Sequence, residues 1–257
     1  IRALGPPRCL VTDPRFKEIR WTAVELSTVS ARMFAAMRPD VELYSMSLEQ
    51  WMSEHAARYQ GTINLILSNP PYGVEWKPAE EGVKKEHAKG AAGRFGPGLP
   101  RISDGQMLFQ LNAIAKMRPF INGEGGGRVG LVHNGSPLFT GDAGSGESEI
   151  RRYILEKDYL DAIVALPTDM FYNTNIATYL WFLSNRKPKE RKGRVMLIDA
   201  SSMGVVMKKN LGKKRFELSE DCQRRIVEAY HAFKNIEWKD GQAIGGRTRA
   251  LKAKVLP

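Results

Sequence analysis

Short apolar runs alternate with amphipathic stretches along most of the chain. Runs rich in Ile, Val, Leu and aromatic residues are typical of buried strands. They occupy residues 20–26, 41–45, 63–68, 128–133, 160–166, 176–184 and 194–199. Stretches whose apolar positions recur at helical spacing lie between them, at residues 28–37, 48–59, 104–117 and 147–157. This alternation predicts an α/β fold with a mostly parallel, doubly wound sheet.

Three further features bear on the organisation of the chain. Only residues 185–193 separate the last two predicted strands, which indicates a C-terminal hairpin. Residues 74–101 carry mixed charge and then several glycines and prolines, so they predict a long irregular loop placed to fold over a substrate. The sequence becomes basic after residue 200, with one amphipathic helix around residues 219–233. We therefore expect a catalytic domain over residues 1–200 and a basic extension with one helix over residues 201–257.

The composition is that of an ordinary soluble globular protein, with 42% hydrophobic and 26% charged residues. No apolar run approaches the length of a membrane span, and the N-terminus lacks a signal-peptide pattern. The two cysteines are far apart, which fits a reducing cytoplasm. The four histidines form no pattern typical of a metal site, so we expect no metal.

The net charge of +11 is concentrated in three basic segments, residues 186–194, 208–215 and 247–254. Such clusters are suited to holding phosphates or an acidic partner. The alternative for each segment is a solvated loop or tail. Charge alone does not decide between these readings.

The most informative motif is Asn69-Pro70-Pro71-Tyr72, which directly follows the apolar run 63–68. The two prolines end the strand and make the backbone rigid. An amide and an aromatic ring are thereby held at the carboxyl end of a strand, where open α/β sheets bind their ligands. The alternative is that Asn-Pro-Pro only forms a turn.

The residue types of this motif suit methyl transfer to a planar amine such as that of adenine. The adenine amine is a poor nucleophile because its lone pair is shared with the ring. The side-chain oxygen of Asn69 and the carbonyl of Pro70 offer two acceptors for its hydrogens. Tyr72 offers a flat face on which an extruded base stacks. We therefore interpret Asn69, Pro70, Pro71 and Tyr72 as a candidate catalytic site.

From residue 63 onward the chain resembles the modification subunits of type I restriction–modification systems and the related N6-adenine DNA methylases. The resemblance extends in order and spacing over about 150 residues, which makes it far more specific than one short motif. Besides Asn-Pro-Pro-Tyr-Gly, it rests on the segments 94–96, 104–117, 126–135, 150–152, 166–174 and 192–200.

The resemblance implies a Rossmann-like S-adenosylmethionine-dependent methyltransferase fold and adenine in double-stranded DNA as substrate. It implies S-adenosyl-L-methionine as methyl donor. The partners that it implies are a specificity subunit and a second modification subunit, with a restriction subunit as a further candidate. Sequence recognition would rest largely with the specificity subunit.

Individual residues take roles from the same resemblance. Asn69 and Pro70 would hold the adenine amine, and Tyr72 would stack on the base. Phe171 would contact the base from another side, or would pack in the core after a strand. Glu25 would accept hydrogen bonds from the ribose hydroxyls of the cofactor, and a solvated carboxylate is the alternative.

The chain also departs from the family pattern. The glycine-rich cofactor motif is absent, and Met46 stands where an Asp commonly contacts the cofactor's adenine. Asn64 replaces an acidic residue. We therefore expect that the chain begins downstream of the glycine-rich motif, lacks the first strand of the sheet and binds the cofactor weakly by itself.

Two other functions are compatible with the sequence. One is a methyltransferase that acts on protein glutamine or on RNA, since Asn-Pro-Pro-Tyr also serves there. The other is a non-catalytic DNA-binding or assembly subunit with a degenerate methyltransferase fold. The leading hypothesis is a site-specific DNA adenine N6-methyltransferase.

Overall fold

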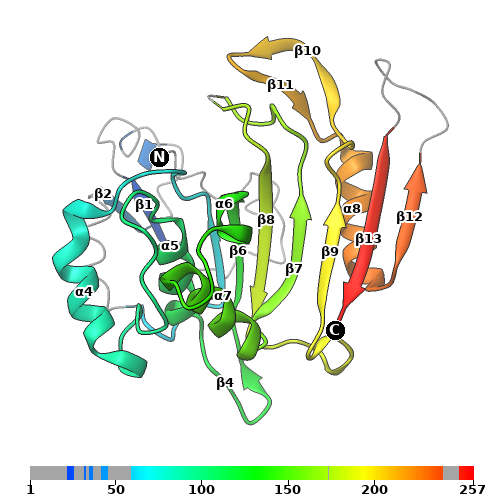
Figure 1. Ribbon diagram of the computed structural model, residues 1–257. Coiled ribbons are helices and arrows are strands. Elements are labelled where there is room, and N and C mark those ends of the chain that lie inside the picture. The colour runs from blue at the N-terminus through cyan, green and yellow to red at the C-terminus, as the bar shows by residue number, and fades with distance from the viewer. Residues whose placement is uncertain are drawn as a thin grey trace.

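A seven-stranded sheet with the order β12-β13-β9-β7-β8-β6-β3 forms the centre of the computed structural model (Figure 1). The structure describes residues 22–25, 32, 35–36, 42–45, 59–172, 174–239 and 249–257. The strands of the sheet are β3 (Leu65–Ser68), β6 (Arg128–Asn134), β7 (Leu160–Ala165), β8 (Thr178–Ser184), β9 (Val195–Asp199), β12 (Ile236–Lys239) and β13 (Ala250–Leu256). Only β8 and β13 run against both of their neighbours. The predicted mostly parallel α/β sheet is therefore confirmed.

The remaining described elements surround this sheet. The helices are α4 (Glu80–Ala88), α5 (Gln106–Lys116), α6 (Ser136–Phe139), α7 (Gly146–Glu156) and α8 (Glu220–Ala232), with short 3₁₀ turns at Lys77–Ala79, Gly90–Ala92 and Lys189–Arg191. Three two-stranded sheets are formed by β1 (Thr22–Glu25) with β2 (Glu42–Ser45), β4 (Phe120–Ile121) with β5 (Glu124–Gly125), and β10 (Val205–Leu211) with β11 (Lys214–Glu217).

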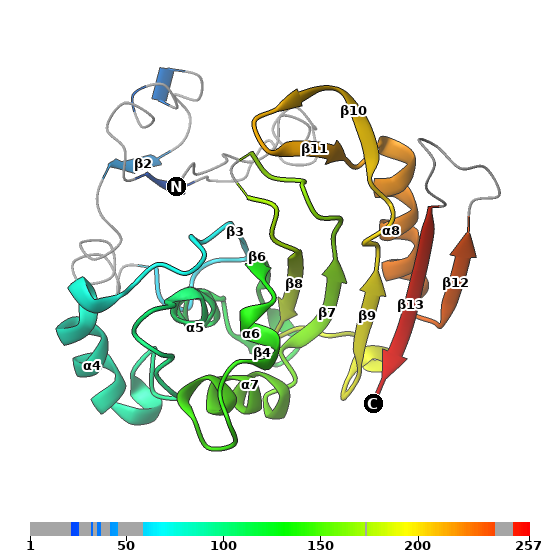
Figure 2. The same ribbon diagram turned by 45° about the horizontal axis from the view of Figure 1, so that its top comes forward.

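Helices cover both faces of the central sheet. Strand β7 is buried on both sides, so its successive residues enter different cores: Ile163 joins the cluster under α5 and α7, whereas Ala162 and Val164 join the cluster under α8. Figures 1 and 2 show α8 on the opposite side of the sheet from α5 and α7. Each fully buried Ile or Leu in these clusters contributes about 1.5–3 kcal/mol. The sheet is doubly wound, as predicted.

The predicted C-terminal hairpin is wrong. Strands β8 and β9 do not pair, because β7 lies between them, antiparallel to β8 and parallel to β9. Ile163 of β7 faces Trp181 of β8 on one side and Leu197 of β9 on the other. Strand β7 is apolar except for the buried Asp161, and this favours an interior position over an edge. The segment 185–194 therefore crosses the end of β7 instead of forming a turn.

The predicted irregular loop over residues 74–101 is also wrong in part, because α4 forms within it. Val83 is the buried residue of this helix, and the side chain of His87 bonds the carbonyl of Phe95, which is fully buried. The helix then ends in a tight turn, where a Cβ on Gly93 would lie 1.8 Å from the carbonyl oxygen of Glu86. The glycines are thus needed for close backbone packing and do not mark a loose loop.

The residues after 200 form more than the single helix expected there. Besides α8 they supply β12 and β13, which extend the central sheet next to β9. These strands alternate between exposed and more buried residues, a short and partly charged pattern that hid them in the sequence. Within the described ranges, no helix is long and apolar enough to cross a membrane.

Candidate active site

The motif Asn69–Tyr72 lies at the carboxyl edge of the sheet, directly after β3. Ser68, the last residue of β3, pairs with Leu131 of the parallel strand β6. Asn69 therefore follows β3 at the level of Val132, two residues before the carboxyl end of β6 at Asn134. In the described part of the chain β3 is an edge strand of the seven-stranded sheet. The predicted position of the motif at a ligand-binding edge is thus what the strand register produces.

The side chains of Asn69 and Tyr72 contact each other. The Tyr72 hydroxyl donates a hydrogen bond of 2.7 Å to Oδ1 of Asn69. Burial raises the pKa of Tyr72 to about 12, so the phenol stays protonated and able to donate near neutral pH. Both residues are half-buried, and Pro70 between them is buried. The bond fixes the orientation of the amide and leaves one lone pair of Oδ1 for another donor.

The chain that follows the motif is anchored to the start of α5. The backbone N–H of Gly105 bonds the carbonyl of Val74 at 3.1 Å, and that of Trp76 bonds the carbonyl of Ile102 at 3.1 Å. The indole N–H of Trp76, which is 7% exposed, donates to the carbonyl of Arg101. These bonds hold the corner from its downstream side, while the prolines stiffen it from within.

A buried polar network lies behind the corner, at the end of β6. The Gln106 amide nitrogen donates to Asp104 and to Oδ1 of Asn134, and its oxygen accepts from the backbone N–H of Asn134 at 3.1 Å. His133 is fully buried beside it, and burial lowers the pKa of His133 to about 4 against an opposing effect of Asp104. This histidine is therefore neutral at neutral pH. None of these residues was predicted from the sequence to act at the site, although they lie in segments 104–117 and 126–135 of the resemblance.

Phe171 lies beyond the carboxyl end of β7, at the same edge of the sheet as the corner. It follows β7, which is separated from β3 by β8 and β6, so the two strand ends are about 14 Å apart across three strand spacings. Phe171 is half-buried, is bridged to Thr174 and belongs to neither core cluster of the described residues. The neighbouring carbonyls of Asp169 and Tyr172 accept N–H bonds from the β10–β11 hairpin. Its role at the base stays a prediction.

Of the two residues predicted to contact the cofactor, the described part of the chain contains one. Glu25 is the last residue of β1, which is paired in parallel with β2. An acid at the carboxyl end of a parallel strand fits the ribose hydroxyls of a nucleoside. Met46 lies outside the described residues. The described residues bring together no group of three or more His, Cys, Asp and Glu side chains for a metal ion.

A doubly wound sheet with helices on both faces and an Asn-Pro-Pro-Tyr corner at its carboxyl edge is a Rossmann-like methyltransferase fold. The sequence model of the N-6 DNA methylase family matches residues 22–245, and the chain belongs to this family. Family and fold together imply the use of S-adenosylmethionine.

The relatives that the chain matches include methylase subunits of type I restriction enzymes. The methylase subunit of the type I restriction enzyme MjaIX from Methanocaldococcus jannaschii is 28% identical over 180 residues, which cover 70% of this chain and 30% of that protein. The MpnII methylase subunit from Mycoplasma pneumoniae is 26% identical over 201 residues, 75% of this chain and 34% of that protein. The chain thus spans about a third of the length of these relatives. The fold is shared with the type I methyltransferase subunit from Streptococcus thermophilus, with a TM-score of 0.66 at 23% identity over 86% of this chain and 43% of that one.

Proposed function

We propose that this chain supplies the adenine-binding part of a site-specific DNA adenine N6-methyltransferase, the modification subunit of a type I restriction–modification system. The observation that carries the proposal is the Asn69–Tyr72 corner, with its fixed amide and aromatic ring at the carboxyl edge of the sheet. Membership of the N-6 DNA methylase family favours DNA over the alternatives of RNA or protein glutamine.

The corner acts by positioning. Oδ1 of Asn69 and the carbonyl of Pro70 accept the two hydrogens of the adenine amine, which localises the lone pair on nitrogen. Tyr72 holds Asn69 through its hydroxyl and offers its ring to the extruded base. Held donors and acceptors of this kind account for a large share of catalysis when the reacting atoms are aligned.

S-adenosylmethionine, when bound, supplies a methyl group on a sulfonium, which is activated without any help from the protein. Glu25 would hold its ribose hydroxyls from the carboxyl end of β1. Glu25 is the described residue that fits this cofactor by position. The hydrogen bonds among Asp104, Gln106 and Asn134, with the neutral His133 packed beside them, hold the end of β6 in place.

The exposed cations of the β10–β11 hairpin favour DNA as the substrate. It follows β9 at the same edge of the sheet, and Figures 1 and 2 show it extending beyond the ends of β7 and β9. Its exposed cations are Lys208, Lys209, Lys213 and Arg215. Phosphate contacts from such an arm position a duplex without reading its sequence. A specificity subunit and a second modification subunit would supply that reading and complete the enzyme.

An Asn69→Ala substitution in the enzyme that contains this chain tests the proposal. We expect methylation of duplex DNA to fall by about 10²- to 10³-fold, as when a pre-organised polar contact is removed, with DNA affinity unchanged. Tyr72→Phe keeps the ring and loses one hydrogen bond of about 1 kcal/mol, so methylation should fall about fivefold.

Transfer of a labelled methyl group to DNA, RNA and protein is measured in parallel. Equal losses of methylation and DNA affinity in Asn69→Ala would contradict the role of Asn69. Labelling of RNA or protein in preference to DNA would replace the proposed substrate.

A further inference from the structure

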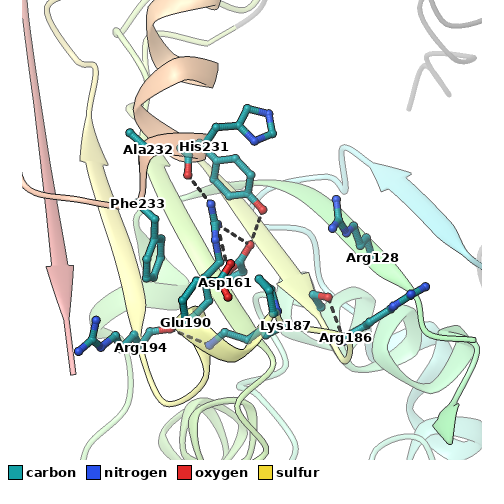
Figure 3. A pocket seen from close by; sticks show the side chains of 13 residues that line it. Arg128, Asp161, Arg186, Lys187, Glu190, Arg194, His231, Ala232 and Phe233 are labelled. Carbon is teal, nitrogen blue, oxygen red and sulfur yellow. Dashed lines mark hydrogen bonds and ion pairs between the residues drawn. The ribbon is translucent and has the colours of Figure 1, made fainter. Parts of the chain in front are cut away.

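A recess lies at the amino edge of the sheet, opposite the edge that carries the Asn69–Tyr72 corner. It has a volume of about 520 Å³ and is formed by the start of β6 and β7, the end of β8, the segment 185–194 and the carboxyl end of α8. Figure 3 shows its side chains. Because parallel strands carry the Asn69–Tyr72 corner at their other end, this recess belongs to a different side of the molecule.

The floor of the recess is a buried ionic network. The Arg191 guanidinium bonds both carboxylate oxygens of Asp161, at 3.3 and 3.2 Å, and also the carbonyl of Tyr230. The Tyr230 hydroxyl donates to the same carboxylate. Arg191 also lies between two rings, 4.3 Å from the centre of Tyr230 and 4.4 Å from that of Phe233. The charged groups of the floor are therefore bonded to one another, which gives the recess a fixed shape.

The charged side chains at the rim are bonded less fully within the protein than those of the floor. Arg128 and Arg194 are exposed, and their side chains form no hydrogen bond or ion pair with any residue that the structure describes. The exposed Arg186 donates to a neutral group, the carbonyl of Gly125, at 3.3 Å, and its guanidinium lies over the Phe120 ring, 5.5 Å from the ring centre. Glu190 offsets part of this charge. Three exposed arginines thus line the recess, with Glu190 as the acid beside them and Asp161 buried in the floor.

The arrangement of these groups indicates the form of the ligand. Arg128 and Arg186 lie on one side of Asp161 and Arg194 on the other (Figure 3). One compact anion would not reach both sides, whereas an extended chain with several carboxylates would. A nucleotide is disfavoured because Arg191 already occupies a face of both rings that line the recess. A duplex is disfavoured because its phosphates lie on a convex cylinder, which does not enter a recess of this size.

We propose that this rim, Arg128, Arg186 and Arg194, is a docking site for an acidic peptide segment of a protein partner. Guanidinium groups bind carboxylates through paired hydrogen bonds, which gives such a site geometric preference beyond charge. The site is independent of methyl transfer, and its loss should leave catalysis at the other edge intact.

A fluorescein-labelled hexaglutamate peptide, titrated into the intact protein and followed by anisotropy, tests the proposal. The rim variant R128Q/R186Q/R194Q should lower peptide affinity by about tenfold, the combined effect of three weak ion pairs. The matched variant K208Q/K209Q/K213Q removes the same charge from the β10–β11 hairpin and should leave peptide affinity within about twofold of the parent, because exposed charges far from the site are screened.

Three results would overturn the proposal: no peptide binding, equal losses in the two variants, or a greater loss of duplex affinity than of peptide affinity in the rim variant. A benzophenone-labelled form of the peptide gives a second measurement on the unmutated protein. Cross-links within residues 186–194 support the proposal, and cross-links confined to the hairpin contradict it.

Discussion

The two edges of the central sheet both carry clustered cations, but the cations serve different purposes. At the amino edge, Lys187 and Arg191 are buried and hold Asp158 and Asp161. At the carboxyl edge, the cations of the β10–β11 hairpin are exposed, and the buried polar groups beneath that edge include the neutral His133. Charge at the amino edge is thus divided between buried ion pairs and the exposed arginines of the rim, whereas the cations of the hairpin at the carboxyl edge are all exposed.

The largest expected effect at the amino edge is on stability. Arg191→Ala leaves Asp161 buried without its ion pair, so the free energy of unfolding should fall by about 3–5 kcal/mol. Urea unfolding of the purified protein measures this change. The matched variant Lys192→Ala alters an exposed neighbour and should unfold like the parent. If both variants have the same stability as the parent, the ionic floor does not stabilise the fold.

At the carboxyl edge, the buried His133 should make the stability of the fold depend on pH. The pKa of His133 is lowered from 6.5 to about 4 in the fold, so the unfolded chain binds a proton first as the pH falls. The stability present above pH 6.5 is therefore lost as pH falls towards 4, by about 3 kcal/mol. Urea unfolding across this range should show a shallower loss for His133→Gln. The exposed His231 provides the control, and a His231→Gln curve as shallow as that of His133→Gln would contradict the assignment.

The smallest expected effect concerns DNA. The hairpin variant K208Q/K209Q/K213Q should lower the affinity of the assembled enzyme for duplex DNA by about 10- to 100-fold, and reduce the slope of log affinity against log salt by up to about 3. Fluorescence anisotropy over a salt series measures both values. The rim variant should match the parent in the same assay. An unchanged slope in the hairpin variant would contradict contact between these lysines and the DNA phosphates.

Much of the fold was predictable because its signals are local. Strands β3, β6 and β7 were predicted within about two residues of their ends, since short apolar runs bounded by polar residues or proline identify strands. Helix α5 was predicted from the spacing of its apolar residues. Strands β12 and β13 were missed because their alternating charged residues give little hydrophobic signal until they pair with β9.

The candidate site also has a part that was predictable from the sequence and a part that was not. The corner at Asn69–Tyr72 was predictable because proline restricts the backbone of its own segment. The contributions of Gln106 and His133 were not predicted, because their roles depend on contacts between α5 and β6 across 27 or 28 residues. A glutamine or histidine on an amphipathic pattern has no local feature that marks it as part of a buried network.

The sequence by itself determined the apolar strands of the central sheet, most of the described helices and the rigid corner, because hydrophobic spacing and proline stereochemistry act within a few residues. Tertiary structure alone decided that β7 separates β8 from β9, and which cations became buried. The segments 186–194 and 208–215 are both strongly basic in sequence. Only the first packs against Asp158, Asp161 and the rings at the end of α8, and those long-range neighbours convert part of its charge into structure.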